Sequence, residues 1–476
     1  MTADKHNGEH STVSAMAIPP AEHPPLGAGL RVLLTDSKRW AVGVRIGMVF
    51  AEMGCEVAML CPAEGHPAAT VRSIHHRFPY SGFHTVASLR AAIRQFRPDL
   101  ILPTCDRGVG HLHRLHSEAR ACGDYWITGR IERSLGPAES YRIVSNRYEL
   151  LKLAREEGIL IPQTIALGSE SDLAGAEKLG LPLVIKADGT WGGCGVKVAL
   201  SRAELRCAFQ SLRGRRGIPR LIRELALNRD RGNTLQDWWN ARPALIAQSW
   251  IDGRPGNCAV ACWNGKVLAG ICVEAVATNG DRGPASVIEI VEGRQMTQAA
   301  ERIARRLNLS GFFGLDFMVE RETGAAYLIE MNPRCTQPCS LTLDTGRNLP
   351  AAICAQLAGR PEPETASVTT LSRIAYFPQP AGRSARPLDL PVWSYYYDIP
   401  PDEPEFVHLL LNQWPDRGRL GQWLDRMRGI DRGTAMSRGR AAGSRDRKRL
   451  RNAPVPWSMP LQGKDASVLN PTERNP

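Results

Sequence analysis

The sequence reads Tyr327-Leu328-Ile329-Glu330-Met331-Asn332-Pro333-Arg334 along one short apolar run, and Gly314-Leu315-Asp316-Phe317 within the run before it. Alternate residues of a strand face the same side, so Glu330 and Asn332 share a face. With Asp316 they supply three hard oxygen donors. That set suits Mg²⁺, which takes few protein ligands and completes its octahedron with water and phosphate oxygens. The pattern predicts a magnesium site on two strands, although an ordinary hairpin with a solvated acidic edge would show the same letters.

Arg334 follows on the side of Glu330 and Asn332 if the strand continues past Pro333. A guanidinium is planar and always charged, and it suits an anionic substrate or a phosphorylated intermediate beside a metal. We therefore expect Arg334 to take part in the same site.

A second informative stretch is Leu183-Val184-Ile185-Lys186, which is followed by a glycine-rich loop and by the strand-like Val196-Lys197-Val198. Glycines let backbone N–H groups approach phosphate oxygens, and a lysine at a strand end supplies a positive charge for them. No G-K-[ST] opens a helix, and the loop returns to a strand, so neither a Walker loop nor a dinucleotide fingerprint is present. A glycine-rich hairpin without function is the alternative for this loop alone.

Taken together, these motifs resemble those of the ATP-grasp superfamily, in the branch of carbamoyl-phosphate synthase and the small carboxylate–amine ligases. The resemblance covers about residues 29–358. It is carried by the motifs at 145–148, 158–164, 184–196, 247–253, 314–317 and 330–334. It implies an α/β and α+β architecture, in which a preATP-grasp parallel-sheet domain precedes a two-subdomain ATP-grasp fold that holds ATP between its subdomains.

The resemblance also implies roles for particular residues. Lys186 would contact the α/β phosphates and act in catalysis, and Arg334 would stabilise an acyl phosphate. Further nucleotide contacts would come from Arg147, Gly192, Gly193 and Gly195, and from the hinge residues Gln248, Ser249, Trp250 and Ile251. Asp316, Glu330 and Asn332 would hold one or two Mg²⁺ ions, with Mn²⁺ as a substitute.

The chain departs from the family pattern at three places. Arg147 stands where a lysine is usual, and Ser249 stands where a glutamate is common. Pro255 and Gly256 occupy the region where an acidic residue often holds the ribose hydroxyls, so Asp252 and Asn257 are the alternatives for that contact.

Strand–helix–strand alternation from Leu30 to Pro103 predicts a parallel sheet with helices on its faces. We expect a disordered leader at 1–28, the preATP-grasp domain at 29–135, the ATP-grasp domain at 136–358, a packing segment at 359–430 and a disordered tail at 431–476. Loops at strand ends make Ser37, Lys38 and Asp106 candidate substrate contacts. The basic stretch 213–243 is predicted to be a surface excursion, with a substrate-binding lid as the alternative.

Composition and charge disfavour some classes of protein but do not indicate a specific function. From Leu411 to Pro476 there are 14 Lys/Arg and 6 Asp/Glu, so this stretch carries +8 of the total +12. Its arginines lack interleaved aromatic residues, so a solvated tail is favoured over nucleic-acid binding. No apolar run reaches a membrane span, and the 12 cysteines are scattered through apolar segments, which favours reduced thiols in a cytoplasmic protein.

Three functions remain open from the sequence. The first is an ATP-dependent ligase that activates a small-molecule carboxylate as an acyl phosphate for attack by an amine-type nucleophile, releasing ADP and phosphate. The second is an ATP-grasp phosphotransferase. The third is a nucleotide-binding regulatory protein without turnover. The resemblance makes a homodimer an expectation for each of them.

Overall fold

The computed structural model describes residues 24–189, 195–213, 243–279, 283–378 and 394–413, all within one compact unit, Met1–Arg417. Four predictions fall wholly or largely outside these ranges: the leader, the basic excursion, the basic tail, and Gly192 with Gly193. Within them, no helix has both the length and the apolar character needed to cross a membrane. Eleven cysteines are described, and all of them are free thiols.

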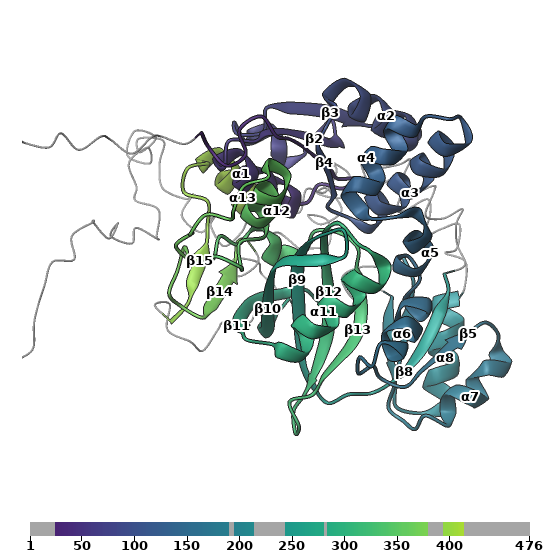
Figure 1. Ribbon diagram of the computed structural model, residues 1–476. Coiled ribbons are helices and arrows are strands. Elements are labelled where there is room, and N and C mark those ends of the chain that lie inside the picture. Colours follow the sequence, from purple (N-terminus) through teal and green to yellow (C-terminus); the bar gives the residue numbers. More distant parts are fainter. Residues whose placement is uncertain (1–23, 190–194, 214–242, 280–282, 379–393, 414–476) are drawn as a thin grey trace, which may run out of the picture. The chain divides into compact units, whose positions relative to one another are not determined.

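The N-terminal region forms a parallel sheet, as predicted (Figure 1). Its strands are β1 (Arg31–Thr35), β2 (Glu56–Pro62), β3 (His76–Tyr80) and β4 (Leu100–Pro103), in the order β3-β2-β1-β4. The helices are α1 (Ala41–Glu52), α2 (Thr85–Phe96), α3 (Asp106–Ala121) and α4 (Tyr125–Leu135). Val32 and Leu34 pack in the core that contains α1, whereas Leu33 packs with α2 to α4. Helices therefore cover both faces, which explains the continuous apolar runs of β1 and β4.

A small antiparallel sheet follows in the chain, with the order β5-β8-β6-β7. Its strands are β5 (Thr164–Leu167), β6 (Leu183–Ala187), β7 (Val196–Ala199) and β8 (Leu245–Ser249). Helices α7 (Leu173–Glu177) and α8 (Arg202–Arg213) share its apolar core. Helices α5 (Tyr141–Val144) and α6 (Arg147–Glu156) come before this sheet in the chain, and α6 packs near β13 of the large sheet.

The large sheet has the order β13-β12-β9-β10-β11-β14-β15. Its strands are β9 (Gly253–Trp263), β10 (Lys266–Thr278), β11 (Ala285–Val291), β12 (Gly311–Glu320), β13 (Ala326–Asn332), β14 (Arg373–Tyr376) and β15 (Tyr396–Asp398). Helix α11 (Arg294–Leu307) covers one face (Figure 1), and α12 (Leu349–Ala358) packs in the core of the other. The segment after residue 358 thus adds two strands to this sheet and then forms α13 (Pro404–Gln413).

Two glycines allow the chain to pass close to β12. A Cβ atom on Gly253 would lie 2.1 Å from the carbonyl oxygen of Val319. A Cβ on Gly314 would lie 2.6 Å from Cγ2 of Thr336. Since both contacts are shorter than any carbon side chain allows, these positions require glycine, and Gly314 brings the segment after β13 against the strand that carries Asp316.

The N-terminal sheet and the large sheet share one apolar core. Phe50 of α1 is fully buried and stacks on Phe312 of β12, with ring centroids 6.1 Å apart. The core of α1 also contains Leu341, Leu349 and Ile353 from the segment after β13. The α1-covered face of the parallel sheet therefore shares its core with the strands that carry the candidate site.

Replacing Phe50 by alanine should lower the free energy of unfolding by about 3–5 kcal/mol, because the fully buried ring leaves a cavity between two sheets. Urea denaturation followed by circular dichroism measures this change. The matched control is Phe83→Ala, since Phe83 is 65% exposed and its loss should change the free energy little. Equal effects of the two substitutions would contradict the shared core.

Candidate active site

Three neighbouring strands bring the polar residues of the site together. The strand register places Asp316 of β12 opposite Glu330 of β13 on one side and opposite Asn257 of β9 on the other. An irregularity in the β12–β13 pairing follows directly after Asp316. Such bulges re-aim side chains and often lie beside active sites. The predicted set Asp316, Glu330 and Asn332 therefore does meet at one place on the sheet.

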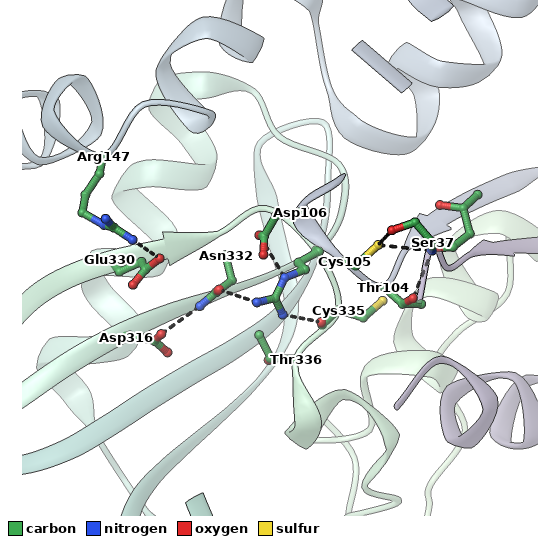
Figure 2. A network of polar contacts seen from close by, with 12 residues as sticks. Ser37, Thr104, Cys105, Asp106, Arg147, Asp316, Glu330, Asn332, Cys335 and Thr336 are labelled. Atoms are coloured by element: carbon green, nitrogen blue, oxygen red, sulfur yellow. Dashed lines mark hydrogen bonds and ion pairs between the residues drawn. The ribbon is translucent and has the colours of Figure 1, made fainter. Parts of the chain in front are cut away.

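Hydrogen bonds hold the carboxylate of Asp316 from two sides. Asn257 Nδ2 donates to Oδ1 at 2.6 Å, and Asn332 Nδ2 donates to Oδ2 at 2.8 Å (Figure 2). Burial, together with repulsion from Glu330, raises the pKa of Asp316. Two carboxylates that repel each other on one sheet are stabilised by a shared cation.

The donor set fits Mg²⁺. Asp316 and Glu330 offer carboxylate oxygens, and Asn332 offers an amide oxygen. Among the described residues there is no group of three or more His, Cys, Asp and Glu side chains arranged to hold a metal. Mg²⁺ typically uses one or two carboxylates and takes its other ligands from phosphate and water.

Arg147, at the start of α6, forms a buried bridge to the site. Its side chain is 8% exposed, and Nη2 donates to Glu330 Oε1 at 2.5 Å. Nη1 donates to Asp188 Oδ1 and to the carbonyl oxygen of Ala187, each at 3.2 Å. Burial opposes the charge of this guanidinium, but Glu330 and Asp188 outweigh it and raise the pKa of Arg147. The planar fork thus connects the end of β6 to β13, which a lysine could not do with the same geometry.

Lys186 lies near the end of β6 and is 6% exposed. Burial, together with the nearby charge of Arg147, lowers the pKa of Lys186 to about 8, against the opposing effects of Glu330 and Asp316. Since Glu330 and Asp316 act on Lys186 directly, the predicted phosphate-binding lysine and the predicted metal ligands belong to one electrostatic site.

The strands that flank the glycine-rich loop pair as predicted, whereas residues 190–194 of the loop lie outside the described part of the chain. Lys186 pairs with Val196 across an antiparallel turn, and Ala187 N donates to the carbonyl oxygen of the buried Gly195 at 2.9 Å. The chain then reaches β8, whose end carries the hinge residues between the small and the large sheets. Gln248 is buried and donates from Nε2 to Thr164 Oγ1, at 3.1 Å.

Backbone bonds fix the next hinge residues. Ser249 N donates to the carbonyl oxygen of Gln163 at 2.9 Å, and its hydroxyl accepts from Gln163 N at 3.1 Å. Trp250 N donates to the carbonyl oxygen of Pro182 at 3.2 Å, and its side chain is 45% exposed. Ile251 is partly buried and leads into β9. The glutamate that is common in this hinge is thus replaced by a serine that binds the end of the preceding segment.

The two alternatives for the ribose contact lie in different surroundings. Asn257 is committed to Asp316, and its Oδ1 is buried without a hydrogen-bond partner among the described residues. Asp252 is well exposed and pairs with Arg321 at 3.4 Å. Asn257 therefore belongs to the candidate metal site, a role that the sequence did not reveal. The signal that could have shown it is the register between β9 and β12, which the sequence does not display.

Arg334 connects the large sheet to the N-terminal sheet. Its Nε donates to Asp106 Oδ1 at 2.9 Å, and its Nη2 donates to Asn332 Oδ1 at 2.9 Å. Its Nη1 donates to the carbonyl oxygen of Cys335 at 3.2 Å. Burial opposes the charge, while Asp106 and Asp316 raise the pKa of Arg334. Asp106, a candidate substrate contact, thus orients a second predicted site residue.

The other two candidate contacts lie after β1. Ser37 is buried, with its hydroxyl 3.2 Å from Cys105 Sγ (Figure 2). The ammonium of Lys38 lies 5.2 Å from the ring centroid of Trp40. Ser37 therefore joins the polar network that leads through Cys105 and Asp106 to Arg334, whereas the ammonium of Lys38 lies near an aromatic ring.

Comparison with known sequences bears out the resemblance. Residues 220–338 match the family described as ATP-grasp domain. Acetyl-CoA carboxylase 2 of Arabidopsis thaliana is 26% identical over 197 residues, which are 40% of this chain and 8% of that protein. The carbamoyl phosphate synthase large chain of Thermus thermophilus is 27% identical over 265 residues, 53% of this chain and 23% of that protein. The chain thus spans less than a quarter of either relative.

Solved structures share the fold. N5-carboxyaminoimidazole synthetase from Staphylococcus aureus, complexed with ADP, has a TM-score of 0.51 at 13% identity, covering 72% of this chain and 80% of that chain. Biotin carboxylase from Campylobacter jejuni has a TM-score of 0.50 at 15% identity, covering 71% of this chain and 73% of that chain. The predicted combination of a preATP-grasp parallel-sheet domain and an ATP-grasp fold is confirmed.

The lowered pKa of Lys186 has a consequence for stability. Between about pH 8 and pH 10.5 the unfolded chain holds a proton on this lysine that the folded chain has released, so this residue makes stability rise with pH in that window. Relative to Lys186→Met, the wild type should gain about 1 kcal/mol in free energy of unfolding from pH 7 to pH 9. Urea titrations of both proteins at the two pH values test this. If the difference in free energy of unfolding between the two proteins stayed constant, or if the wild type lost stability relative to the variant as the pH rose, the burial of Lys186 would be contradicted.

Proposed function

Since the chain carries an ATP-grasp domain, we propose that it is an ADP-forming ligase that activates a carboxylate with ATP for attack by an amine-type nucleophile. The observation that carries this proposal is the meeting of Asp316, Glu330 and Asn332 with Lys186 and Arg334 at one end of the large sheet. Acidic oxygens for a metal, a buried lysine for phosphates and a fixed guanidinium for an anion are the parts that phosphoryl transfer needs.

ATP would lie between the small and the large sheets. Lys186, Arg147 and the loop that ends at Gly195 would hold the phosphates, with Gly192 and Gly193 as further backbone donors. The hinge from Gln248 to Ile251 would meet the adenine. Asp316, Glu330 and Asn332 would hold Mg²⁺, one ion or two, with Mn²⁺ as a substitute. Bound there, the metal neutralises charge on the β and γ phosphates.

The chemistry follows from the weakness of a carboxylate as an electrophile, since an amine does not displace oxide from it. A carboxylate oxygen would attack the γ-phosphorus, the bond to the β-phosphate oxygen would break, and ADP would leave. The amine would then attack the acyl carbon, phosphate would leave with the carbon–oxygen bond electrons, and the nitrogen would lose a proton. Positioning and electrostatics supply the rate, with no covalent enzyme intermediate.

Arg334 is suited to the acyl phosphate. A guanidinium carries five N–H donors, and the described contacts use three of them, toward Asp106, Asn332 and Cys335. The remaining donors can meet a phosphoryl or carboxylate oxygen without movement of the side chain. A preorganised donor of this kind costs no reorganisation when charge develops.

One observation favours a second candidate, a nucleotide-binding regulatory protein. The guanidinium of Arg147 is bonded to Glu330, which is a proposed metal ligand. A site whose ligand is held by a resident cation could bind nucleotide without turnover. A phosphotransferase remains the alternative among enzymes. It differs from a ligase because ADP formation would need only one acceptor substrate. We further propose small-molecule partners, a cytoplasmic location, a homodimer and no nucleic-acid partner.

Replacing Glu330 by glutamine should lower kcat for ADP formation at least a hundredfold, because the carboxylate charge that holds the metal is lost while the shape is kept. The assay is ADP release from Mg-ATP with pooled small carboxylates and pooled amines. Glu322→Gln is the matched control, since Glu322 is exposed in the turn of the same hairpin and should keep wild-type activity. Wild-type ADP release that needs both pools supports a ligase. Release with one pool indicates a phosphotransferase, and ATP binding without release indicates a regulatory protein.

Removal of divalent metal should abolish ADP formation while leaving the fold intact. EDTA is added in excess, activity is measured, and Mg²⁺ or Mn²⁺ is then restored. We expect full recovery with Mg²⁺ and an unchanged circular dichroism spectrum throughout, because Arg147 already neutralises Glu330 in the protein alone. Activity that persists in EDTA would contradict the metal assignment.

A further inference from the structure

A small pocket lies at the carboxyl end of β1, outside the proposed ATP site. Its lining includes Thr35, Asp36, Ser37, Tyr80, Gly108 and His111. Its enclosed space holds about one water-sized group. The pocket therefore suits a small head group rather than a nucleotide.

The pocket lies where the topology of the parallel sheet predicts a ligand. In the order β3-β2-β1-β4, the chain runs from β1 to β2 and β3 on one side, and then crosses to β4 on the other side. The connections after β1 and after β4 therefore leave in opposite directions. They open a crevice at the carboxyl ends of the two strands, and such switch points are the usual ligand sites of open α/β sheets.

Buried polar atoms in this pocket lack partners. The side chain of Asp36 is fully buried. Its Oδ1 accepts from Lys38 N at 2.8 Å, but its Oδ2 has no hydrogen-bond partner among the described residues. The hydroxyl of Thr35, also buried, is unpartnered in the same part of the structure. A buried carboxylate oxygen without a donor is unfavourable, so these atoms call for a bound donor.

His66 faces Asp36 without a hydrogen bond to it. His66 Nε2 lies 3.6 Å from Asp36 Oδ2, which is close enough for an ion pair when the imidazole is protonated. Neither atom has a hydrogen-bond partner among the described residues. The other ring nitrogen of His66 accepts from Ala68 N at 3.1 Å, which fixes the orientation of the ring. A donor group placed against Asp36 would therefore meet a carboxylate oxygen that accepts no hydrogen bond from the described residues.

The charge of the pocket indicates what that group is. The described lining contains the carboxylate of Asp36 and neither lysine nor arginine. Burial, together with the positive charges of Arg107 and Arg114, lowers the pKa of His111 to about 4, so its imidazole is neutral near pH 7. A carboxylate without a cation in the lining favours a donor or a cation over an anion.

A chain of polar contacts runs from this pocket to the proposed ATP site. Ser37 lines the pocket and contacts Cys105, and the next residue, Asp106, bonds to Arg334. Arg334 in turn bonds to Asn332 of the metal set. Figure 2 shows Ser37, Cys105, Asp106, Asn332 and Asp316 within one network. An anion at Arg334 and an amino group at Asp36 would therefore lie at the two ends of a continuous polar path.

We propose that this pocket binds the amino group of a substrate, with Asp36 Oδ2 as its acceptor and the Thr35 hydroxyl as a second contact. This inference rests on the proposed ligase function, for which it names the chemical class of one substrate. The amino group could belong to the amine nucleophile or to an amino acid whose carboxylate is activated. Both sources share the chemistry that Asp36 recognises.

The first test is binding, measured on the full chain by ligand-observed NMR in the presence of Mg-ADP. The probes are the twenty common amino acids and simple primary amines such as ethylamine, each beside its N-acetyl form. We expect at least one free amine to bind and its N-acetyl form not to bind. Asp36→Asn should weaken that binding at least tenfold. Glu118→Gln, which changes a partly exposed carboxylate of α3, should leave it unchanged.

Thr35→Val tests whether a loss of amine binding could result from misfolding of the variant. The hydroxyl of Thr35 is unpartnered, so its removal should leave Tm the same or higher while it weakens the amine probe severalfold. Binding of an amino acid with no binding of simple amines identifies an amino-acid substrate, and the reverse identifies the nucleophile. Failure of every free amine to bind the wild type, or equal binding by Asp36→Asn, overturns the proposal, since the pocket would then hold water only.

The proposed function is judged separately, by ADP release. If ADP forms but Asp36→Asn leaves the KM for the amine-bearing substrate unchanged, the ligase stands and the pocket assignment is wrong. If amine probes bind through Asp36 but no ADP forms, the pocket stands and the ligase is wrong. When both hold, Asp36→Asn should raise the KM for the amine-bearing substrate at least tenfold and leave the KM for ATP within twofold of the wild type.

Discussion

The buried guanidinium of Arg334 joins two sheets that are far apart in the sequence. It bonds to Asp106 at the start of α3, 228 residues earlier, and to Asn332 at the end of β13. Asn332 in turn holds Asp316, so the position of the metal set depends on a residue of the N-terminal domain. Ion pairs of this kind add little net stability, because desolvation offsets attraction, but breaking one partner leaves an uncompensated charge. The pair therefore serves to orient the site more than to hold the fold.

Local patterns were sufficient for much of the fold. The β12–β13 pair follows from the two apolar runs that carry Asp316 and Glu330. The apolar residues of α11 recur with helical spacing, so this sequence alone indicates a helix. The lysine-bearing strand and the return strand after the glycine loop pair as expected. Strand β3 was missed because its residues are mostly exposed and its pattern lacks the apolar run of its neighbours.

Contacts between segments that are distant in the sequence limited how much of the candidate site could be predicted. Asp316, Glu330 and Asn332 lie on the two adjacent strands of one hairpin, so their spacing in the sequence was enough to predict that they meet. Asn257 joins them only through the register of β9 with β12, and Arg147 reaches Glu330 across 183 residues. The strands β14 and β15 likewise join the sheet from a segment whose own sequence carries weak signals. Such contacts depend on how whole elements pack, which no local pattern encodes.

The bridge from Arg147 to Glu330 and Asp188 has a consequence for how the protein exists before it meets any ligand. A nucleotide site with bare carboxylates would repel itself in the empty protein and would need its metal in order to assemble. Here a side chain of the chain itself acts as a resident counter-ion, so the strands can assemble around a balanced charge. If Glu330 holds a cation as proposed, that cation would replace Arg147 as the ion partner of Glu330. Ligand binding would then exchange ion partners on a fold that already exists without the ligand.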